Sequence, residues 1–175
     1  MQLARETIVE PYQYLQDAPV TTSLLNQTIG LVGVERQLRE VVQALLLQIA
    51  TFHSYHDVEM LALVPEQTYA TDWAQWRWLP HFKIHALNLR GIVHNIQTKE
   101  MVVNSFYQLL NKRRQLVSEK SHEQLTFSPH YILTILDDSW LAGHGLNEFL
   151  AEDMSQYGVT VIWGKEGAAM LPETV

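Results

Sequence analysis

The feature that most constrains the fold is an apolar run at Val58–Val64, VEMLALV, which Pro65 closes. A strand with apolar residues at consecutive positions has no polar face to turn toward water. Such strands are typical of parallel sheets, because helices cover both faces of these sheets. The run therefore predicts a strand that is buried on both faces.

Predicted strands and helices alternate along the chain. Apolar residues at helical spacing predict a helix over 35–52, with a buried face formed by Leu38, Val41, Val42, Leu45, Ile49 and Phe52 and widened by Leu46 and Leu47. Other helices are predicted from a cap at Thr71 or Asp72 to Pro80, over Lys99–Ser118 with Thr98 as cap, and over Leu146–Tyr157 before Gly158. Strands are predicted at Val20–Asn26, Thr28–Gly33, Tyr131–Asp137 and Val159–Trp163, with one or two short strands in Ile84–Asn95. This order predicts an α/β fold, with a mostly parallel sheet and helices on both faces.

Composition excludes several classes of protein. The 175 residues suffice for one domain with a full core, and a net charge of −7 argues against binding nucleic acid through a general basic surface. No cysteine is present, which excludes disulfides and thiolate metal sites. No stretch reaches the roughly 20 apolar residues of a membrane span, and no signal pattern begins the chain. The ending AAMLPETV has no helix stop or polar tail, so we expect a segment of a longer protein.

The turn between the strand at 28–33 and the following helix occupies the place of a phosphate-binding loop. It carries Gly30 and Gly33, but no Lys-Ser or Lys-Thr follows, and no lysine precedes Lys83. A working loop uses that lysine to neutralise phosphate and the hydroxyl to bind magnesium. Glu35 would instead repel an anion, and Arg36 offsets this only in part. Tight packing of helix on strand explains the glycines equally well.

The run YILTILDDSW has the form of a Walker B motif, an apolar strand that ends in two acids. In an active site the first carboxylate, here Asp137, assists Mg²⁺ and the second, Asp138, orients water. Acids at the end of a strand also simply meet solvent or cap the next segment. Without a lysine-containing loop, we expect these positions to be the remnant of a nucleotide site.

Arg113 falls on the apolar stripe of the helix predicted over 99–118. Two explanations remain open. The side chain either extends from the helix edge into water, or it pairs in the interior with Asp137 or Asp138.

Histidines occur as two pairs, His53 with His56 and His81 with His85. Neither pair forms an H-E-x-x-H motif, and Pro80 disfavours a helical face at His81. We therefore expect surface or capping histidines and no metal site. The sequence also lacks a G-x-S-x-G elbow, a common signal of hydrolases.

An aromatic segment, TDWAQWRWLPHF, holds Trp73, Trp76 and Trp78 with Arg77 among them. On a helix, Trp73 and Trp76 share a face and Trp78 is displaced from it. Core packing accounts for some of this surface. Because Trp and Arg are favoured anchors at interfaces, the four residues are also a candidate contact with another domain.

Together these motifs resemble the EssC/EccC-type membrane ATPases of type VII secretion systems, which belong to the FtsK/SpoIIIE-like group. The resemblance rests on VTTSLLNQTIGLVGVERQL with the helix and strand after it, on WRWLPHF, and on HYILTILDDSWL. It covers nearly the whole chain and implies a RecA-like three-layer sandwich, P-loop NTPase-like but degenerate. Residues 1–19 would be an N-terminal extension or linker and residues 20–175 the degenerate ATPase domain. Trp163-Gly164 stands where active relatives place a small polar residue.

The resemblance implies a non-catalytic domain that couples membrane helices to downstream ATPase domains, on the cytoplasmic side of the cell membrane. Its partners would be those domains and the membrane subunits of the secretion system, and a hexamer of the parent protein is compatible with it. No cofactor is expected here, while other domains of the parent, itself an ATPase, would use ATP and magnesium. One alternative is a nucleotide hydrolase with a non-standard phosphate loop, using Arg36 and Asp137. Another, a Rossmann-like binding module, lacks its G-x-G-x-x-G sequence.

Overall fold

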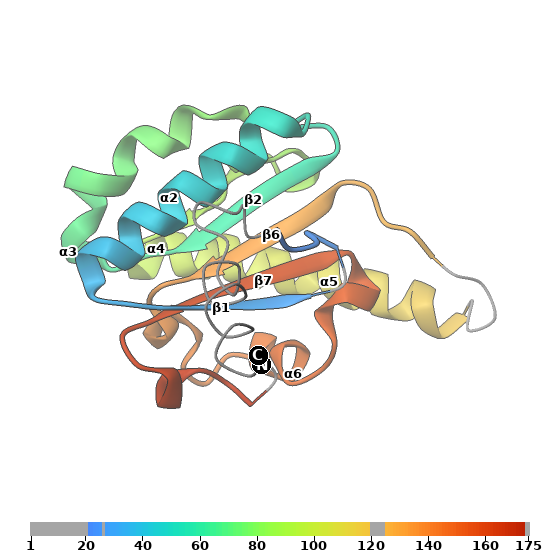
Figure 1. The fold of residues 1–175 in the computed structure, drawn as a ribbon. Coiled ribbons are helices and arrows are strands. Elements are labelled where there is room, and N and C mark those ends of the chain that lie inside the picture. Colours follow the sequence, from blue (N-terminus) through green and yellow to red (C-terminus); the bar gives the residue numbers. More distant parts are fainter. Residues whose placement is uncertain (1–20, 26, 120–124, 174–175) are drawn as a thin grey trace, which may run out of the picture.

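The computed structural model describes residues 21–25, 27–119 and 125–173. Five strands form a parallel sheet in the order β1-β7-β6-β2-β5, as Figure 1 shows. They are β1 Thr28–Val32, β2 Val58–Leu63, β5 Ile92–Val93, β6 His130–Ile135 and β7 Val159–Lys165. Two short strands, β3 Lys83–Ile84 and β4 Leu89–Arg90, pair antiparallel in a separate ribbon. The prediction of a mostly parallel α/β sheet is confirmed.

Helices cover both faces of this sheet. Its α-helices are α2 Glu35–Phe52, α3 Glu66–Thr68, α4 Ile96–Thr98, α5 Asn104–Glu119 and α6 Leu146–Leu150. Helix α2 lies on one side of the sheet and α6 on the other (Figure 1). None of the helices among the described residues is long and apolar enough to cross a membrane.

Alternate residues of the central strands supply two separate cores. Leu61 and Leu133 point to the layer that contains α5 and α6, while Met60 and Ile132 point to the layer that contains α2. All six positions of β2 are buried, as its mostly apolar sequence predicts, and they include the charged Glu59. The three layers match the predicted sandwich. Pairing of β6 with β7 fixes the relative positions of the ends of these two strands.

Several predicted elements differ from the structure. Residues 21–25 form no strand, and the rest of the predicted strand, with the proposed extension at 1–19, lies outside the described residues. The aromatic segment is not one α-helix, because α3 continues as a π-helical turn, Tyr69–Trp73, and a 3₁₀ helix, Ala74–Trp78. The segment begins at Glu66 without a side-chain cap, so the predicted cap at Thr71 or Asp72 is wrong.

The next helix also begins earlier than predicted. The Asn95 side chain caps α4 by accepting a hydrogen bond from the Thr98 backbone N–H. In return, the Thr98 hydroxyl accepts a hydrogen bond from the Asn95 backbone N–H. Thr98 is therefore the third residue of a capping box and not the cap itself. A π-helical turn, Lys99–Val103, joins α4 to α5.

The C-terminal helix is shorter than predicted. Helix α6 stops at Leu150, and a 3₁₀ helix, Met154–Tyr157, precedes Gly158. Gly158 has a φ of 68°, the left-handed conformation expected of a residue that ends a helix. Strand β7 runs two residues beyond its predicted end, to Lys165.

Candidate functional site at the carboxyl edge of the sheet

The carboxyl ends of the parallel strands meet at one edge of the sheet, where α/β proteins place their ligand sites. A cavity of about 260 Å³ lies there. The N-terminus of α2, the ends of β6 and β7, and the aromatic segment all contribute to its wall. Its charged lining residues are two acids and two bases, Glu35, Glu166, Arg39 and Lys165.

The loop that enters this edge is too short to surround a phosphate. Gly30 lies inside β1, in register with Trp163, so only Gly33 and Val34 separate the strand from α2. The Gly33 backbone N–H donates to the Lys165 carbonyl oxygen at 3.2 Å and is not free for a ligand. A Cβ at Gly33 would meet nothing nearer than 3.9 Å. Neither crowding nor a left-handed backbone therefore requires a glycine here, so the predicted tight packing of helix on strand does not explain Gly33.

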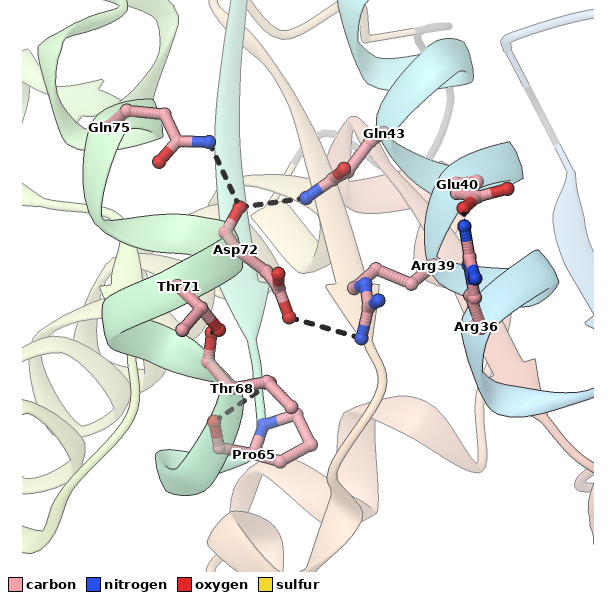
Figure 2. A network of polar contacts seen from close by, with 9 residues as sticks. All are labelled: Arg36, Arg39, Glu40, Gln43, Pro65, Thr68, Thr71, Asp72 and Gln75. Carbon is pink, nitrogen blue, oxygen red and sulfur yellow. Dashed lines mark hydrogen bonds and ion pairs between the residues drawn. The ribbon is translucent and has the colours of Figure 1, made fainter.

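Arginines at the start of α2 are engaged with neighbouring carboxylates. Arg36 pairs with Glu40 at 3.0 Å on the surface, and Arg39, which lines the cavity, pairs with Asp72 at 3.0 Å (Figure 2). Glu35 lies in the first turn of α2 and lines the cavity. The nearest cations thus serve intramolecular ion pairs, while a negative charge occupies the position where an anion would bind.

The two acids after β6 also have intramolecular partners. Asp137 accepts a hydrogen bond from the Ser139 backbone at 3.0 Å and caps the short helix Asp138–Leu141. Asp138 pairs with the Lys165 ammonium at 2.8 Å. Lys165 is 8% exposed, so its charge is held at the sheet edge in direct contact with the carboxylate. The Lys165 cation therefore sits beside the acid that would orient water in an active site.

Lys165 is the residue that sequence reasoning missed. Its position just after the predicted strand Val159–Trp163 could have indicated it, because neighbouring parallel strands end at the same edge of a sheet. The predicted strand stopped at Trp163, which left Lys165 outside the site.

Gly164 packs under the cavity. A Cβ at this position would lie 2.4 Å from Leu136 and 3.3 Å from Leu38. The small polar residue of active relatives would therefore need Leu136 to move. Packing between β7 and α2, rather than room for a reacting group, governs this position.

Asp72 links α2 to the aromatic segment. Besides the Arg39 ion pair, its backbone carbonyl accepts hydrogen bonds from Gln43 at 2.8 Å and from Gln75 at 3.4 Å (Figure 2). From the sequence, only a capping role was predicted for Asp72. Its contact with Gln43 could not be predicted, because the two residues are 29 positions apart in the chain.

The aromatic segment divides between core and surface. Trp73 is fully buried and Trp76 is 9% exposed, with their ring centroids 5.9 Å apart. Trp78 is 68% exposed, and the Arg77 guanidinium lies 4.6 Å from its ring centroid. The predicted split of faces is confirmed, and Arg77 with Trp78 are the part that remains available for contact.

Both explanations for Arg113 are wrong. The side chain is 7% exposed, and it donates to the backbone carbonyls of Tyr157 at 2.6 Å and Pro129 at 2.7 Å. Pro129 precedes β6, whereas Asp137 and Asp138 follow it, so the acids lie at the opposite end of the strand. Burial lowers the pKa of Arg113. The guanidinium thus joins α5 to the segments that enter β6 and β7.

His53, His56 and His85 are exposed, as predicted, and His81 is the exception. His81 is buried, and its Nε2 lies 2.8 Å from the His53 carbonyl oxygen. His85 contacts the buried carboxylate of Glu59 through Nδ1 at 2.9 Å. Among the residues that the structure describes, no three His, Cys, Asp or Glu side chains are grouped to hold a metal ion.

Fold and site together define a class. The domain is a RecA-like, ATPase-like α/β sandwich. At the carboxyl edge of its sheet, the positions of the two nucleotide-binding motifs are present, but their side chains contact other residues of the protein. No protein-family model matches the sequence. Comparison with characterised proteins nevertheless assigns its ancestry.

The chain is homologous to the EssC/EccC proteins of type VII secretion systems. It is 34% identical over 171 residues to the type VII secretion system protein EssC of Staphylococcus aureus strain NCTC 8325. It is also 34% identical over 168 residues to the ESX secretion system protein EccC of Geobacillus thermodenitrificans. Each match covers 96% of this chain but only 11% of the relative. The resemblance read from the motifs is confirmed.

A solved structure shows the same fold. The chain "EssC (ATPases 2 and 3) from Geobacillus thermodenitrificans" superposes with a TM-score of 0.62 over 88% of this chain, at 14% identity. The match covers 31% of that structure. The predicted ATPase-like fold is therefore confirmed.

Proposed function

We propose that this chain is a non-catalytic, ATPase-like domain of a type VII secretion motor. The observation that carries the proposal is the ion pair between Lys165 and Asp138 at the nucleotide-site edge. In an active site Asp138 would have to be free to orient water, and the two-residue turn at Gly33 offers no lysine to receive the phosphates of a nucleotide. The proposal therefore assigns no bound cofactor to this domain and leaves ATP and magnesium to other domains of the parent protein.

Coupling is the role that such a domain retains. The parent protein would place it between membrane helices and downstream ATPase domains, on the cytoplasmic side of the membrane. Its partners would be those domains, the membrane subunits of the secretion system, and neighbouring copies in a hexamer of the parent. In support, Arg77 and Trp78 offer an exposed aromatic and cationic contact of the kind that anchors interfaces.

Replacement of Trp78 by Ala in the longer secretion protein tests this role. We expect secretion to fall by about tenfold or more, as for the loss of a central interface anchor. The melting temperature should stay unchanged, because the side chain is 68% exposed. Ile96→Ala is the matched control, since Ile96 is 69% exposed outside the aromatic segment. Normal secretion by the Trp78 variant would contradict the assigned contact.

A further inference from the structure

The stretch of residues 73–99 differs from the rest of the chain in charge. It holds four of the 12 basic residues, Arg77, Lys83, Arg90 and Lys99, and none of the 19 acidic residues. The whole chain has a net charge of −7, so this stretch is basic within an otherwise acidic protein. A separation of charge of this kind creates a local positive potential, which attracts acidic partners.

Two of these cations lie opposite each other in the β3–β4 ribbon, where Lys83 is in register with Arg90. The Gly91 backbone N–H donates to the Phe82 carbonyl oxygen at 2.7 Å, which makes residues 82 and 91 a hydrogen-bonded pair. Hydrogen-bonded and non-hydrogen-bonded pairs alternate along an antiparallel ladder. Lys83 and Arg90 therefore form a pair of the second kind, in which the α-carbons are only about 4.5 Å apart and the side chains are closest.

The ribbon directs both cations away from the core. Side chains alternate between the two faces of a strand, and Ile84, next to Lys83, is fully buried in the core that contains α5. Lys83 and Arg90 share the opposite face, on which Lys83 is half-buried and Arg90 is exposed. Like charges directly opposite each other destabilise a sheet. The pair is therefore unfavourable in the domain by itself, which favours a role in binding a negatively charged partner.

The exposed aromatic residue lies close to this ribbon. A 3₁₀ turn, Pro80–Phe82, connects Trp78 to β3, and five residues of chain cannot separate the α-carbons of Trp78 and Lys83 by more than about 18 Å. The Arg77 guanidinium lies 4.6 Å from the Trp78 ring centroid and adds a third positive charge. We call Arg77, Trp78, Lys83 and Arg90 the basic surface.

We propose that the basic surface docks an acidic segment of another domain of the secretion motor, with carboxylates at Lys83 and Arg90 and an apolar side chain against Trp78. The inference rests on the proposed function, which assigns Arg77 and Trp78 to an interface. A carboxylate between Lys83 and Arg90 would offset their repulsion and form charge-assisted hydrogen bonds to both. An anionic membrane fits less well, because its broad surface would also face the acidic remainder of the chain.

Zero-length cross-linking with a carbodiimide tests for a carboxylate at Lys83. The reagent joins an amine to a carboxylate in direct contact with it, and it is applied to the longer secretion polypeptide in its assembled membrane complex. Mass spectrometry should find Lys83 joined to an Asp or Glu of another domain about tenfold more often than the exposed control Lys112, as for a specific charge contact. The Lys165–Asp138 pair, at 2.8 Å, is the internal positive control.

Four results would overturn the proposal. Cross-links of Lys83 no more frequent than those of Lys112 would mean that no carboxylate docks there. A cross-link to an acid of the same copy of this domain, residues 1–20 included, would make the contact internal, and one to this domain in a second copy would show self-association. Sedimentation of the 175-residue chain with phosphatidylglycerol vesicles, abolished by Lys83→Gln with Arg90→Gln, would identify a lipid surface as the occupant.

Neutral substitutions separate docking from folding. Lys83→Gln with Arg90→Gln should raise the melting temperature of the 175-residue chain by about 1–4 °C, because the cross-strand repulsion is removed. In the longer polypeptide the same variant should lower secretion by about tenfold, because the docked carboxylates lose their partners. Lys112→Gln is the control and should change neither quantity. A lower melting temperature of the double variant, or its normal secretion, would contradict the proposal.

Failure of this inference is separable from failure of the proposed function. If Trp78→Ala impairs secretion while the Lys83 and Arg90 double variant does not, the interface remains and its acidic partner is refuted. If neither variant impairs secretion, both proposals fail.

Discussion

At the residue scale, Arg113 shows how a charge on an apolar helix stripe is accommodated. Its guanidinium lies 4.6 Å from the Tyr131 ring centroid and donates to carbonyl oxygens that other secondary structure leaves available. Carbonyl acceptors hold the cation directly, and attraction to the buried Glu59 offsets part of the lowering of the Arg113 pKa by burial.

Replacing Arg113 by Met should lower the free energy of unfolding by about 2–4 kcal/mol, because it leaves buried carbonyl groups without donors. Denaturant unfolding followed by circular dichroism measures the change. The neighbouring exposed residue provides the control, and Lys112→Met should be within about 0.5 kcal/mol of wild type. Equal stability of the two variants would contradict the structural role of Arg113.

His130 gives the fold a pH dependence. Burial, followed by repulsion from Arg113 and His53, lowers its pKa to about 4 from the ordinary histidine value of 6.5. Its Nε2 lies 2.8 Å from the Thr160 hydroxyl. In the unfolded chain His130 therefore binds a proton below about pH 6.5, whereas in the folded chain it does so only below about pH 4.

Stability from this group is complete above pH 6.5 and declines as the pH falls toward 4. The loss is at most about 3 kcal/mol, from 1.36 kcal/mol per pKa unit. In His130→Gln this contribution should vanish. Urea unfolding at pH 7 and pH 4.5 measures it, as the difference between wild type and variant at each pH. The idea fails if both proteins lose the same stability over that interval.

At the element scale, contacts distant in sequence hold α2 against the aromatic segment. The Arg39–Asp72 pair is about one quarter exposed on both sides, whereas the Arg36–Glu40 pair on the same helix is mostly exposed. The first pair is also supported by Gln43, which donates to the Asp72 carbonyl.

A double-mutant cycle compares these two ion pairs. Alanine substitutions at Arg39 and Asp72 should show a coupling energy of about 1 kcal/mol, because partial burial reduces screening by solvent. The Arg36–Glu40 cycle, as the control, should give at most about 0.5 kcal/mol. Unfolding in urea supplies both values. A coupling for Arg39–Asp72 no larger than that of the control would refute its role in holding the two elements together.

The order of elements followed from the sequence because apolar periodicity differs between buried strands and amphipathic helices. That signal placed β1, α2, β2, β6 and β7 correctly. It failed for the aromatic segment, which breaks into π-helical and 3₁₀ turns while Trp73 and Trp76 pack into the same core as α2. It also failed for Val41, Leu47 and Phe52, which are exposed, because their spacing indicates an apolar face without showing whether the edge of the sheet covers it.

The candidate site was predictable in place but not in contacts. Asp137 and Asp138 follow a predicted parallel strand, so their position at the carboxyl edge followed directly. Their partners depend on strand order, which places β7 next to β6 and brings Lys165 to Asp138. A single sequence contains no direct record of that order.

At the scale of the whole molecule, the fold and the site motifs give different information. The parallel sheet and the homologues agree on an EssC/EccC ancestry and an ATPase-like architecture. At the edge where such a fold would bind nucleotide, the two basic side chains, Arg39 and Lys165, are each paired with a carboxylate of the protein. The domain would then contribute surfaces and rigidity to a motor instead of a hydrolytic step.

Thermal unfolding of the 175-residue chain with and without excess Mg-ATP tests this central claim most directly. The account predicts the same melting temperature in both samples, because the Gly33 turn offers no lysine to the phosphates and Asp138 is already paired with Lys165. A nucleotide present at about 100 times its dissociation constant would add about 2.7 kcal/mol of stability. A clear rise in melting temperature with Mg-ATP would contradict the account and favour a nucleotide-hydrolysing domain with a non-standard phosphate loop.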